Sequence, residues 1–321
     1  MSSSSENSVQ TFNLTKSYGE AKALDGLTLG VRRGEILVIL GPNGSGKTTF
    51  LHLISTVLRP TSGTATVMGY DIVKQPLKVR ESIGISFQDP RGFWRHKPYH
   101  ILSFHASMYG LRGEERSKAV EDTLKDFELW QSRNKRFMEL SGGQAKRLEV
   151  AKLFVHRPDV AVFDEPTAMV DLEGKRMIWD MIRQLREKGS TVIVATNEVR
   201  EAEYLADRIC IMKDGKELVM ESLMTLKDSI TGGDVVDLEM SVPVSEEILR
   251  TVRDVPGTVR ALQGGERSLR TFVNRSEDWL PLMMTAMQGL GVRVSSIRVS
   301  EPSLDDVFLH YTGKEVVQSH A

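Results

Sequence analysis

The sequence contains a single cysteine, Cys210, among its 321 residues. One cysteine excludes an intrachain disulfide framework and is typical of a reducing compartment. Cys210 lies in an apolar run between Ile209 and Ile211. We expect a small buried core residue rather than a reactive thiol, because free cysteine packs mostly as a small apolar side chain.

Long apolar runs are also absent. No stretch of about 18 consecutive apolar residues occurs, so we do not expect the chain to span a membrane by itself. The opening residues 1–6 are polar and have neither a basic start nor an apolar centre, which argues against a signal peptide. We predict that residues 1–8 are disordered.

An excess of charge of either sign is missing as well. The chain has 42 Lys and Arg residues against 43 Asp and Glu residues, and its formal net charge is -1. This balance gives no overall field that would favour nucleic acid or an anionic membrane surface, so we expect no nucleic acid partner. The hydrophobic content of 40% and the charged content of 26% are ordinary for a globular protein, and the length favours two domains.

The most informative stretch that is present is a glycine-rich loop between two apolar segments. It matches G-x-x-x-x-G-K-[ST] at every fixed position and reads Gly41, Pro42, Asn43, Gly44, Ser45, Gly46, Lys47 and Thr48. Residues 36–40 before it predict a strand buried on both faces of a parallel sheet, and residues 49–54 predict the start of a helix. In this context backbone N–H groups and the helix N-terminus bind phosphate. Lys47 is predicted to reach the terminal phosphates and Thr48 to bind Mg²⁺, whereas the alternative is a glycine-rich turn with a stray lysine.

A second apolar strand, residues 160–163, ends in the carboxylates Asp164 and Glu165. Two charges at the end of such a strand are costly unless they meet a cation or a polar site. Asp164 is predicted to hold Mg²⁺, and Glu165 to orient or deprotonate an attacking water. The alternative is that the pair caps the next helix. A third buried strand, residues 191–196, is followed by Asn197.

Two other stretches are open to two interpretations. Residues 140–144, Leu-Ser-Gly-Gly-Gln, begin a helix and form either an anion site or only a helix cap. Residues 91–110 are rich in aromatic residues and form either the core of a helical subdomain or a docking surface for another protein. Tyr18, upstream of the glycine loop, has no role that can be assigned on its own.

The remaining segments predict a larger domain followed by a smaller one. In the first part we expect antiparallel strands over residues 9–31 with turns at Tyr18-Gly19 and Asp25-Gly26, a first helix that ends at residues 60–63, and a hairpin around Asp214-Gly215. In the second part the expected order is βαββαβ, the ferredoxin-like arrangement, over residues 235–242, 246–252, 258–262, 268–273, 278–290 and 292–299. The predicted divisions are residues 1–8, 9–230, 231–313 and a tail at 314–321.

Four of these pieces stand in one order: the glycine loop, Gln88, residues 140–144 and Asp164-Glu165. Over residues 9–220 this order resembles the nucleotide-binding subunit of an ABC transporter. The resemblance implies an α/β P-loop NTPase fold, with antiparallel β and helical subdomains, followed here by the small ferredoxin-like α+β domain. ATP and Mg²⁺ are the cofactors that it implies.

The resemblance also implies a role for each matching residue. Tyr18 would stack on adenine, the loop from Gly41 through Thr49 would bind the phosphates, Thr48, Gln88 and Asp164 would hold Mg²⁺, and Glu165 would activate the hydrolytic water. In this family two subunits face each other head to tail. The residues that would then reach the nucleotide of the opposite subunit are Ser141, Gly142, Gly143, Gln144 and Asp171.

The C-terminal part extends the resemblance to one class of exporter. Residues 301–309, Glu-Pro-Ser-Leu-Asp-Asp-Val-Phe-Leu, with Thr312-Gly313 after them, resemble the ending of daunorubicin-resistance ATP-binding subunits, whose integral membrane partners are ABC-2 permeases. This implies an ATP-hydrolysing subunit that powers export, cytoplasmic and held at the inner face of the cell membrane by its permease. It favours docking for residues 91–110, leaves homodimer and heterodimer open, and does not reveal the cargo.

Asn197 departs from the family pattern, which has a histidine at this position. An amide can donate a hydrogen bond to phosphate but cannot carry the imidazolium charge. The alternative is that Asn197 only caps a helix beginning at Glu198. Met169 and Val170 likewise replace the small residues usual before Asp171. We therefore expect slow or partner-dependent turnover; the other hypotheses are an ATP-gated dimerisation switch with little hydrolysis and a non-transport ABC ATPase.

Overall fold

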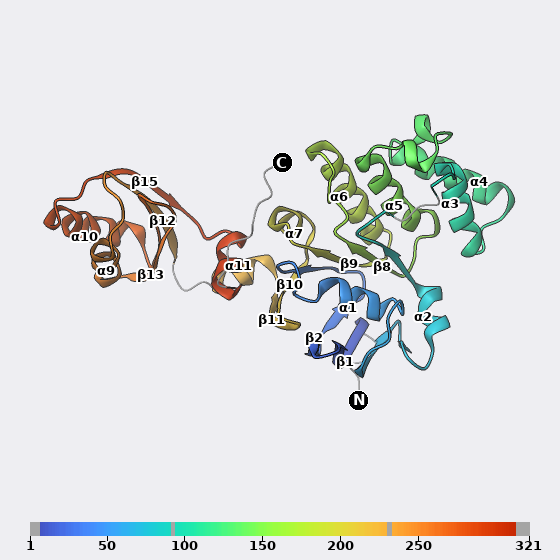
Figure 1. Ribbon diagram of the computed structural model, residues 1–321, viewed down its shortest axis with the longest axis horizontal. Coiled ribbons are helices and arrows are strands. Elements are labelled where there is room, and N and C mark those ends of the chain that lie inside the picture. The colour runs from blue at the N-terminus through green and yellow to red at the C-terminus, as the bar shows by residue number, and fades with distance from the viewer. Residues whose placement is uncertain (1–6, 91–93, 230–232, 313–321) are drawn as a thin grey trace. The chain divides into compact units, whose positions relative to one another are not determined.

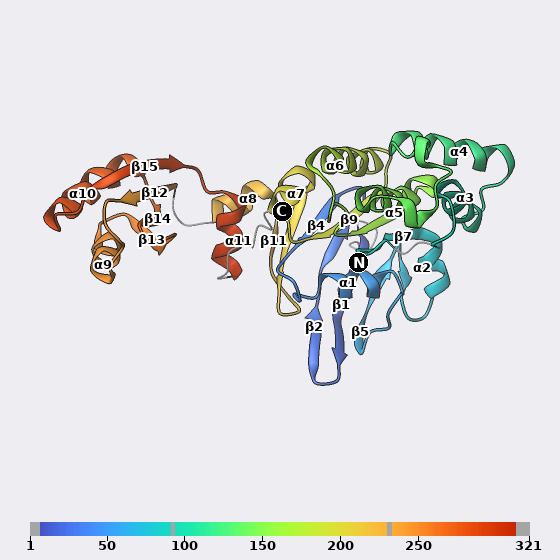
Figure 2. The same cartoon turned by 45° about the horizontal axis from the view of Figure 1, so that its top comes forward.

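The computed structural model describes residues 7–90, 94–229 and 233–312 (Figures 1 and 2). The predicted tail at 314–321 and residues 1–6 lie outside these residues. The disorder predicted for residues 7 and 8 was wrong, because both belong to strand β1 (Asn7–Tyr18). The chain forms two compact units that divide between Ser222 and Leu223. Helix α8 (Leu223–Ser229) therefore falls in the second unit, whereas the sequence placed the boundary after residue 230.

A six-stranded sheet organises the first unit. Its order is β11-β10-β4-β9-β8-β7, and every neighbouring pair is parallel except β10 and β11. The strands are β4 (Ile36–Leu40), β7 (Ile83–Ser86), β8 (Val160–Asp164), β9 (Thr191–Thr196), β10 (Arg208–Lys213) and β11 (Lys216–Glu221). All residues of β4, β8 and β9 are buried, as their largely apolar sequences predict.

An antiparallel sheet packs on one face of the parallel sheet, with helix α1 (Lys47–Ile54) between them. Its order is β2-β1-β5-β6, and β3 also pairs with β1. The strands are β1 (Asn7–Tyr18), β2 (Ala21–Leu27), β3 (Gly30–Arg32), β5 (Ser62–Val67) and β6 (Tyr70–Asp71). The turn at Tyr18-Gly19 is present. The turn expected at Asp25-Gly26 was wrong: both residues lie inside β2, where the register with β1 shifts and Gly26 has φ +71°, as in a bulge.

Helix α1 is shorter than the sequence predicts. It ends at Ile54, not at residues 60–63, because Thr56 has the left-handed φ of 58° and breaks the helix. Its apolar side chains Phe50, Leu51 and Leu53 are buried in the core between the two sheets. This position anchors the glycine loop that precedes it.

Helices cover the other face of the parallel sheet and form the predicted helical subdomain. Figures 1 and 2 show α5 (Gly142–His156), α6 (Leu172–Glu187) and α7 (Val199–Leu205) on this face. α3 (Pro98–Met108) and α4 (Gly113–Asp126) pack on each other and on α5. The short elements α2 (Pro76–Ser82), η1 (Trp130–Ser132) and η2 (Phe137–Glu139) complete the unit. Among the described residues, no helix combines the length and the apolar character needed to cross a bilayer.

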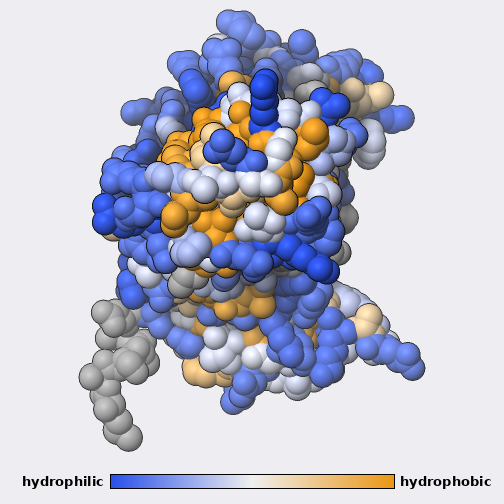
Figure 3. All heavy atoms as spheres, turned by 90° about the vertical axis from the view of Figure 1, so that its left-hand side faces the viewer, coloured by the Kyte–Doolittle hydropathy of each residue, from blue (hydrophilic) through white to orange (hydrophobic). Residues whose placement is uncertain are grey.

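The second unit contains a four-stranded antiparallel sheet with the predicted element order βαββαβ. The elements are β12 (Asp234–Met240), α9 (Glu246–Asp254), β13 (Thr258–Gln263), β14 (Ser268–Val273), α10 (Ser276–Gly289) and β15 (Val294–Ser300). The sheet order is β13-β14-β12-β15. Its apolar core includes Trp279, Met283 and Met287 of α10. The ferredoxin-like assignment stays a prediction. Figure 3 faces this unit and shows apolar side chains gathered on its surface. In α10, Leu282 and Met284 are exposed.

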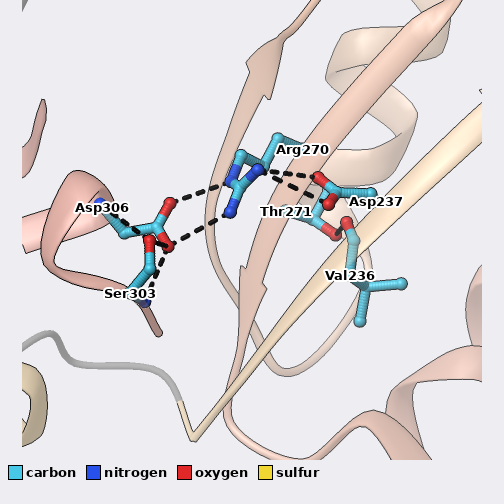
Figure 4. Close-up of polar contacts among 6 residues, drawn as sticks. All are labelled: Val236, Asp237, Arg270, Thr271, Ser303 and Asp306. Atoms are coloured by element: carbon cyan, nitrogen blue, oxygen red, sulfur yellow. Dashed lines mark hydrogen bonds and ion pairs between the residues drawn. The ribbon is translucent and has the colours of Figure 1, made fainter. Parts of the chain in front are cut away.

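An ion pair fixes helix α11 (Leu304–Thr312) to the sheet of the second unit (Figure 4). The Arg270 Nε and Nη2 atoms donate to the two carboxylate oxygens of Asp306 at 2.8 and 3.1 Å. Asp306 is only 3% exposed, and it also accepts hydrogen bonds from the backbone N–H and the hydroxyl of Ser303. A two-point arginine–carboxylate contact gives both strength and a fixed orientation. The exporter-like residues 301–309 thus contain the docking contact of α11.

Candidate functional site

The glycine loop runs from the end of β4 into the first turn of α1. Gly46 is the N-cap of α1 with φ 103°, a conformation that favours glycine. A Cβ atom at Gly46 would collide with the Ala23 carbonyl oxygen, and one at Gly41 would collide with the Met212 carbonyl oxygen. These two glycines therefore allow the loop to lie close to neighbouring backbone.

The loop lines a cavity of about 300 Å³ with residues from three other segments. The lining residues are Ala23, Asn43, Gly44, Gly46, Lys47, Thr48, Thr49, Gln88 and Glu165. The Lys47 Nζ atom donates to the Gly41 and Pro42 carbonyl oxygens at 2.8 and 3.1 Å. Burial lowers the pKa of Lys47, whereas the carboxylates of Glu165 and Asp164 raise it. The cavity thus combines a cation, backbone N–H groups at a helix N-terminus and a carboxylate.

Asp164 is the last residue of β8 and is 1% exposed. Its Oδ1 atom accepts a hydrogen bond from the Thr48 hydroxyl at 3.1 Å, and its buried Oδ2 atom has no hydrogen-bond partner among the residues that the structure describes. Burial raises the pKa of Asp164, and the Thr48 hydrogen bond and the charges of Lys146 and Lys47 oppose this shift. A buried carboxylate oxygen without a donor, beside a hydroxyl, fits the oxygen ligands that Mg²⁺ prefers.

Glu165 lies just beyond the strand, with the left-handed φ of 46°. Its N–H group donates to the Ala195 carbonyl oxygen at 2.9 Å, and its Oε2 atom accepts a hydrogen bond from the Gln88 amide at 2.9 Å. Burial raises the pKa of Glu165, although Lys47 opposes the shift. A raised pKa brings a carboxylate closer to the range of an efficient general base. The helix-capping alternative was wrong, because the N-cap of α6 is Asp171.

Asn197 follows β9 and contacts the glycine loop directly. Its Nδ2 atom donates to Asn43 Oδ1 at 3.2 Å. The alternative role as a helix cap was wrong, because the N-cap of α7 is Glu198 and the helix begins at Val199. The amide of Asn197 is therefore available at the mouth of the phosphate loop.

The other predicted nucleotide-binding residues do not line this cavity. Ser141 is the N-cap of α5, where its hydroxyl accepts from the Gln144 N–H at 3.2 Å in a capping box. A Cβ atom at Gly142 or Gly143 would meet no atom within 4 Å, so this turn faces open space within the described chain. Asp171 caps α6 on an exposed surface. These residues therefore lie outside the lining of the cavity of their own chain.

Tyr18 also stands outside the lining of the cavity. It is 52% exposed, and the Lys16 ammonium lies 5.2 Å from the centre of its ring. Its predicted stacking on adenine stays a prediction.

Sequence reasoning missed two residues next to the site. Ala23 of β2 lines the cavity, and Lys146 of α5 is buried beside Asp164. Ala23 carries no chemical signal in the sequence. Lys146 could have been singled out, because it lies between the helix start at Ser141 and the buried apolar residues that follow it in α5.

Comparisons with known proteins agree with this geometry. Residues 24–168 match the family model described as ABC transporter. The daunorubicin resistance ATP-binding protein DrrA3 of Streptomyces coeruleorubidus is 33% identical over 94% of this chain and 94% of its own length. The Nod factor export ATP-binding protein I of Rhizobium etli is 30% identical over 95% of this chain and 93% of its own length.

Solved structures show the same fold for the first unit. An ATP-binding cassette solved as a dimer in a post-hydrolysis state with ADP and phosphate has a TM-score of 0.64 and 30% identity, and the match covers 67% of this chain and 98% of that chain. The glycine loop, the carboxylates after β8 and these similarities agree with one another. The chain belongs to the family of ABC transporter ATP-binding proteins.

Proposed function

We propose that this chain binds and hydrolyses Mg²⁺-ATP to power export through a separate integral membrane permease of the ABC-2 class. The observation that carries the proposal is the arrangement of Lys47, Thr48 and Asp164 beside Gln88 and Glu165. Relatives that match nearly the full length of the chain are named for drug resistance and for Nod factor export, which supports the role in export.

The residues around the cavity have separate chemical roles in this proposal. The glycine loop and Lys47 bind the phosphates, and Thr48, Gln88 and Asp164 hold Mg²⁺. When bound, Mg²⁺ neutralises charge on the phosphate oxygens. Glu165 accepts a proton from the attacking water, and the hydrogen bond from Gln88 orients its carboxylate. Asn197, next to Asn43, donates an amide hydrogen bond toward the terminal phosphate.

A second ATP-binding subunit completes the site in this proposal. Ser141, Gly143 and Asp171 lie outside the cavity of their own chain and would contact the nucleotide held by the other subunit. A cassette similar to the first unit was solved as a dimer, which supports this assembly. The partner is either a second copy of this chain or a related subunit.

The permease contacts the helical subdomain in this proposal and holds the chain at the cytoplasmic face of the membrane. Of the aromatic residues predicted to form either a core or a docking surface, Trp94 and Phe104 are 72% and 57% exposed. Phe93 lies outside the described residues. Exposed aromatic side chains are typical of protein interfaces, which supports docking over core packing for these two residues.

The substitution Glu165→Gln tests the proposed function. It removes the base but keeps the hydrogen-bonding shape of the side chain, so hydrolysis should fall by at least about a hundredfold while ATP still binds. Steady-state phosphate release and equilibrium binding of ATP, both with Mg²⁺, measure the two effects. Glu187→Gln, an exposed glutamate of α6, is the matched control and should hydrolyse ATP like the unchanged chain.

Two results would count against the proposal in different ways. Normal hydrolysis by Glu165→Gln would remove Glu165 as the base. Negligible hydrolysis by the unchanged chain with its permease, together with ATP-dependent dimerisation, would favour the switch hypothesis, which the replacement of histidine by Asn197 supports.

A further inference from the structure

Lys146 is a buried cation that does not line the cavity. It lies on α5, is 2% exposed, and is surrounded by backbone carbonyl groups rather than by a paired carboxylate. Its Nζ atom donates to the carbonyl oxygens of Phe87, Gln88 and Asp164 at 3.1, 2.7 and 3.4 Å. The three N–H donors of the ammonium thus have three acceptors.

These three carbonyl groups belong to the ends of two neighbouring strands. Phe87 and Gln88 follow β7, Asp164 ends β8, and the two strands are paired in parallel. The Gln88 side chain donates to Glu165, and the Asp164 side chain accepts from Thr48. Lys146 therefore contacts the backbone of Gln88 and of Asp164, the two residues whose side chains make these hydrogen bonds at the site.

Glu149 lies one helical turn further along α5 and contacts the same segment. It accepts a hydrogen bond from the segment, whereas Lys146 donates to it. Its Oε1 atom accepts from the Phe87 N–H at 3.4 Å, and Lys152 fixes its Oε2 atom at 2.6 Å. Residues three apart on a helix lie on one face, so Lys146 and Glu149 can both contact the segment that follows β7. α5 thus holds both the N–H group of Phe87 and the carbonyl groups of Phe87 and Gln88.

The charge of Lys146 also acts on the site. Burial lowers the pKa of Lys146, and the carboxylates of Glu149, Asp164 and Glu165 raise it. Lys146 and Lys47 each lower the pKa values of Asp164 and Glu165, so two ammonium groups favour the ionised form of this carboxylate pair. A buried lysine is costly, and it is tolerated here because carbonyl oxygens solvate all of its donors.

We propose that Lys146 is a positioning residue for the Mg²⁺ site, where it holds the backbones of Gln88 and Asp164 in register so that their side chains reach one ion. This inference rests on the proposed function, which assigns Gln88 and Asp164 to Mg²⁺. Mg²⁺ requires near-octahedral geometry and tolerates displaced ligands poorly. Loss of groups that orient metal ligands typically lowers metal affinity by about tenfold to a hundredfold.

Because α5 begins at the Ser141 turn, this helix connects the turn to the backbone groups that Lys146 contacts. The turn would face the nucleotide of a second subunit, and Lys146 lies little more than one turn further along the helix. A shift of α5 would move Lys146 and, through its three hydrogen bonds, the residues next to Mg²⁺. Lys146 thereby connects the dimer contact to the metal site of its own chain.

The test is a Mg²⁺ titration of the purified full chain loaded with the fluorescent analogue trinitrophenyl-ATP. The variant Lys146→Met removes the three donors and keeps most of the side-chain length. We expect its affinity for the analogue in EDTA to stay within about twofold of the unchanged chain, because the glycine loop is intact. The Mg²⁺ concentration at the midpoint of the fluorescence change should rise at least about tenfold.

Two further variants make the result specific. Arg147→Met is the matched control: it removes a cation from the same helix, but Arg147 contacts Phe127 and Glu128 and not the site. Its Mg²⁺ midpoint should be unchanged. Lys146→Arg keeps the charge and the donors and should restore most of the Mg²⁺ affinity. A purely structural role would lower the fraction of active protein without moving the midpoint.

The outcomes separate this inference from the proposed function. If the unchanged chain shows no Mg²⁺-dependent binding, the proposed function is wrong. If it does, and the midpoint of Lys146→Met equals that of Arg147→Met, Lys146 does not position the metal ligands. Should Lys146→Met fail to fold by circular dichroism, Lys146→Gln, which is shorter and has two donors, decides in its place; a midpoint equal to that of the control contradicts the proposal.

Discussion

Individual residues at the site were predictable where chemistry fixes the residue type. Lys47, Thr48, Gln88 and Glu165 line one cavity because the glycine loop and the ends of parallel strands meet at the same edge of the sheet. The contact of Asn197 with Asn43 and the role of Lys146 depend on tertiary packing and have no fixed sequence spacing. Sequence alone therefore predicted the chemically distinctive residues that line the cavity, but not Lys146, which contacts the backbone next to them.

Asn197 is predicted to limit the rate of ATP hydrolysis. The substitution Asn197→His introduces the residue that the family pattern has at this position, and its ring can carry a charge toward the terminal phosphate. We expect steady-state ATP hydrolysis to rise severalfold, measured with the permease present. An unchanged or lower rate would show that Asn197 does not limit turnover.

Individual elements were predictable where local pattern and tertiary environment agree. β4 is an unbroken apolar run, and β8 and β9 have apolar centres; all three are buried strands. Asp25-Gly26 has turn composition but forms a bulge in β2, because pairing with β1 overrides the local preference. No glycine or proline follows directly after Ile54, the last residue of α1, so the sequence analysis predicted a helix end that is too late.

The packing of α3 against α5 predicts a dependence of stability on pH. His105 and His156 are adjacent, with ring centroids 4.9 Å apart, and neither Nε2 atom has a hydrogen-bond partner within the described residues. Burial, together with the charges of His156 and Lys152, lowers the pKa of His105 to about 3, and burial lowers the pKa of His156 to about 4. Tyr109 stacks on His156 and contributes no opposite charge.

Because the folded pKa values lie below the ordinary value of 6.5, the unfolded chain binds more protons between about pH 6.5 and pH 3. The free energy of unfolding should therefore fall as the pH falls through this window. Urea unfolding at several pH values measures the slope, and the double substitution of His105 and His156 by Gln should flatten it. An equal slope in the double variant would contradict the assignment.

The docking of α11 gives a second prediction at the scale of elements. Arg270→Met leaves the buried carboxylate of Asp306 with only the Ser303 donors, which should lower the stability of the second unit by about 2 kcal/mol. Amide hydrogen exchange in α11 should accelerate. Arg298→Met, an exposed arginine of β15, is the control and should leave exchange in α11 unchanged. Slow exchange in both variants would show that Arg270 does not hold the helix.

At the scale of the whole molecule, the family assignment covers nearly the full chain, and the first unit contains the nucleotide site. The order of the glycine loop, Gln88, residues 140–144 and Asp164-Glu165 made this assignment possible from the sequence. The identities of the proposed permease and second ATP-binding subunit leave no comparable pattern, because protein contacts depend on exposed surfaces such as that of Trp94 and Phe104.

The proposed function requires ATP to bind at the loop between β4 and α1. Equilibrium titration of the purified, folded chain with Mg²⁺-ATP, beside Lys47→Ala, measures this directly. We predict saturable binding by the unchanged chain and binding about tenfold to a hundredfold weaker by Lys47→Ala, because one charge-assisted contact to the phosphates is lost. No saturable binding by the unchanged chain, or equal binding by Lys47→Ala, would contradict it.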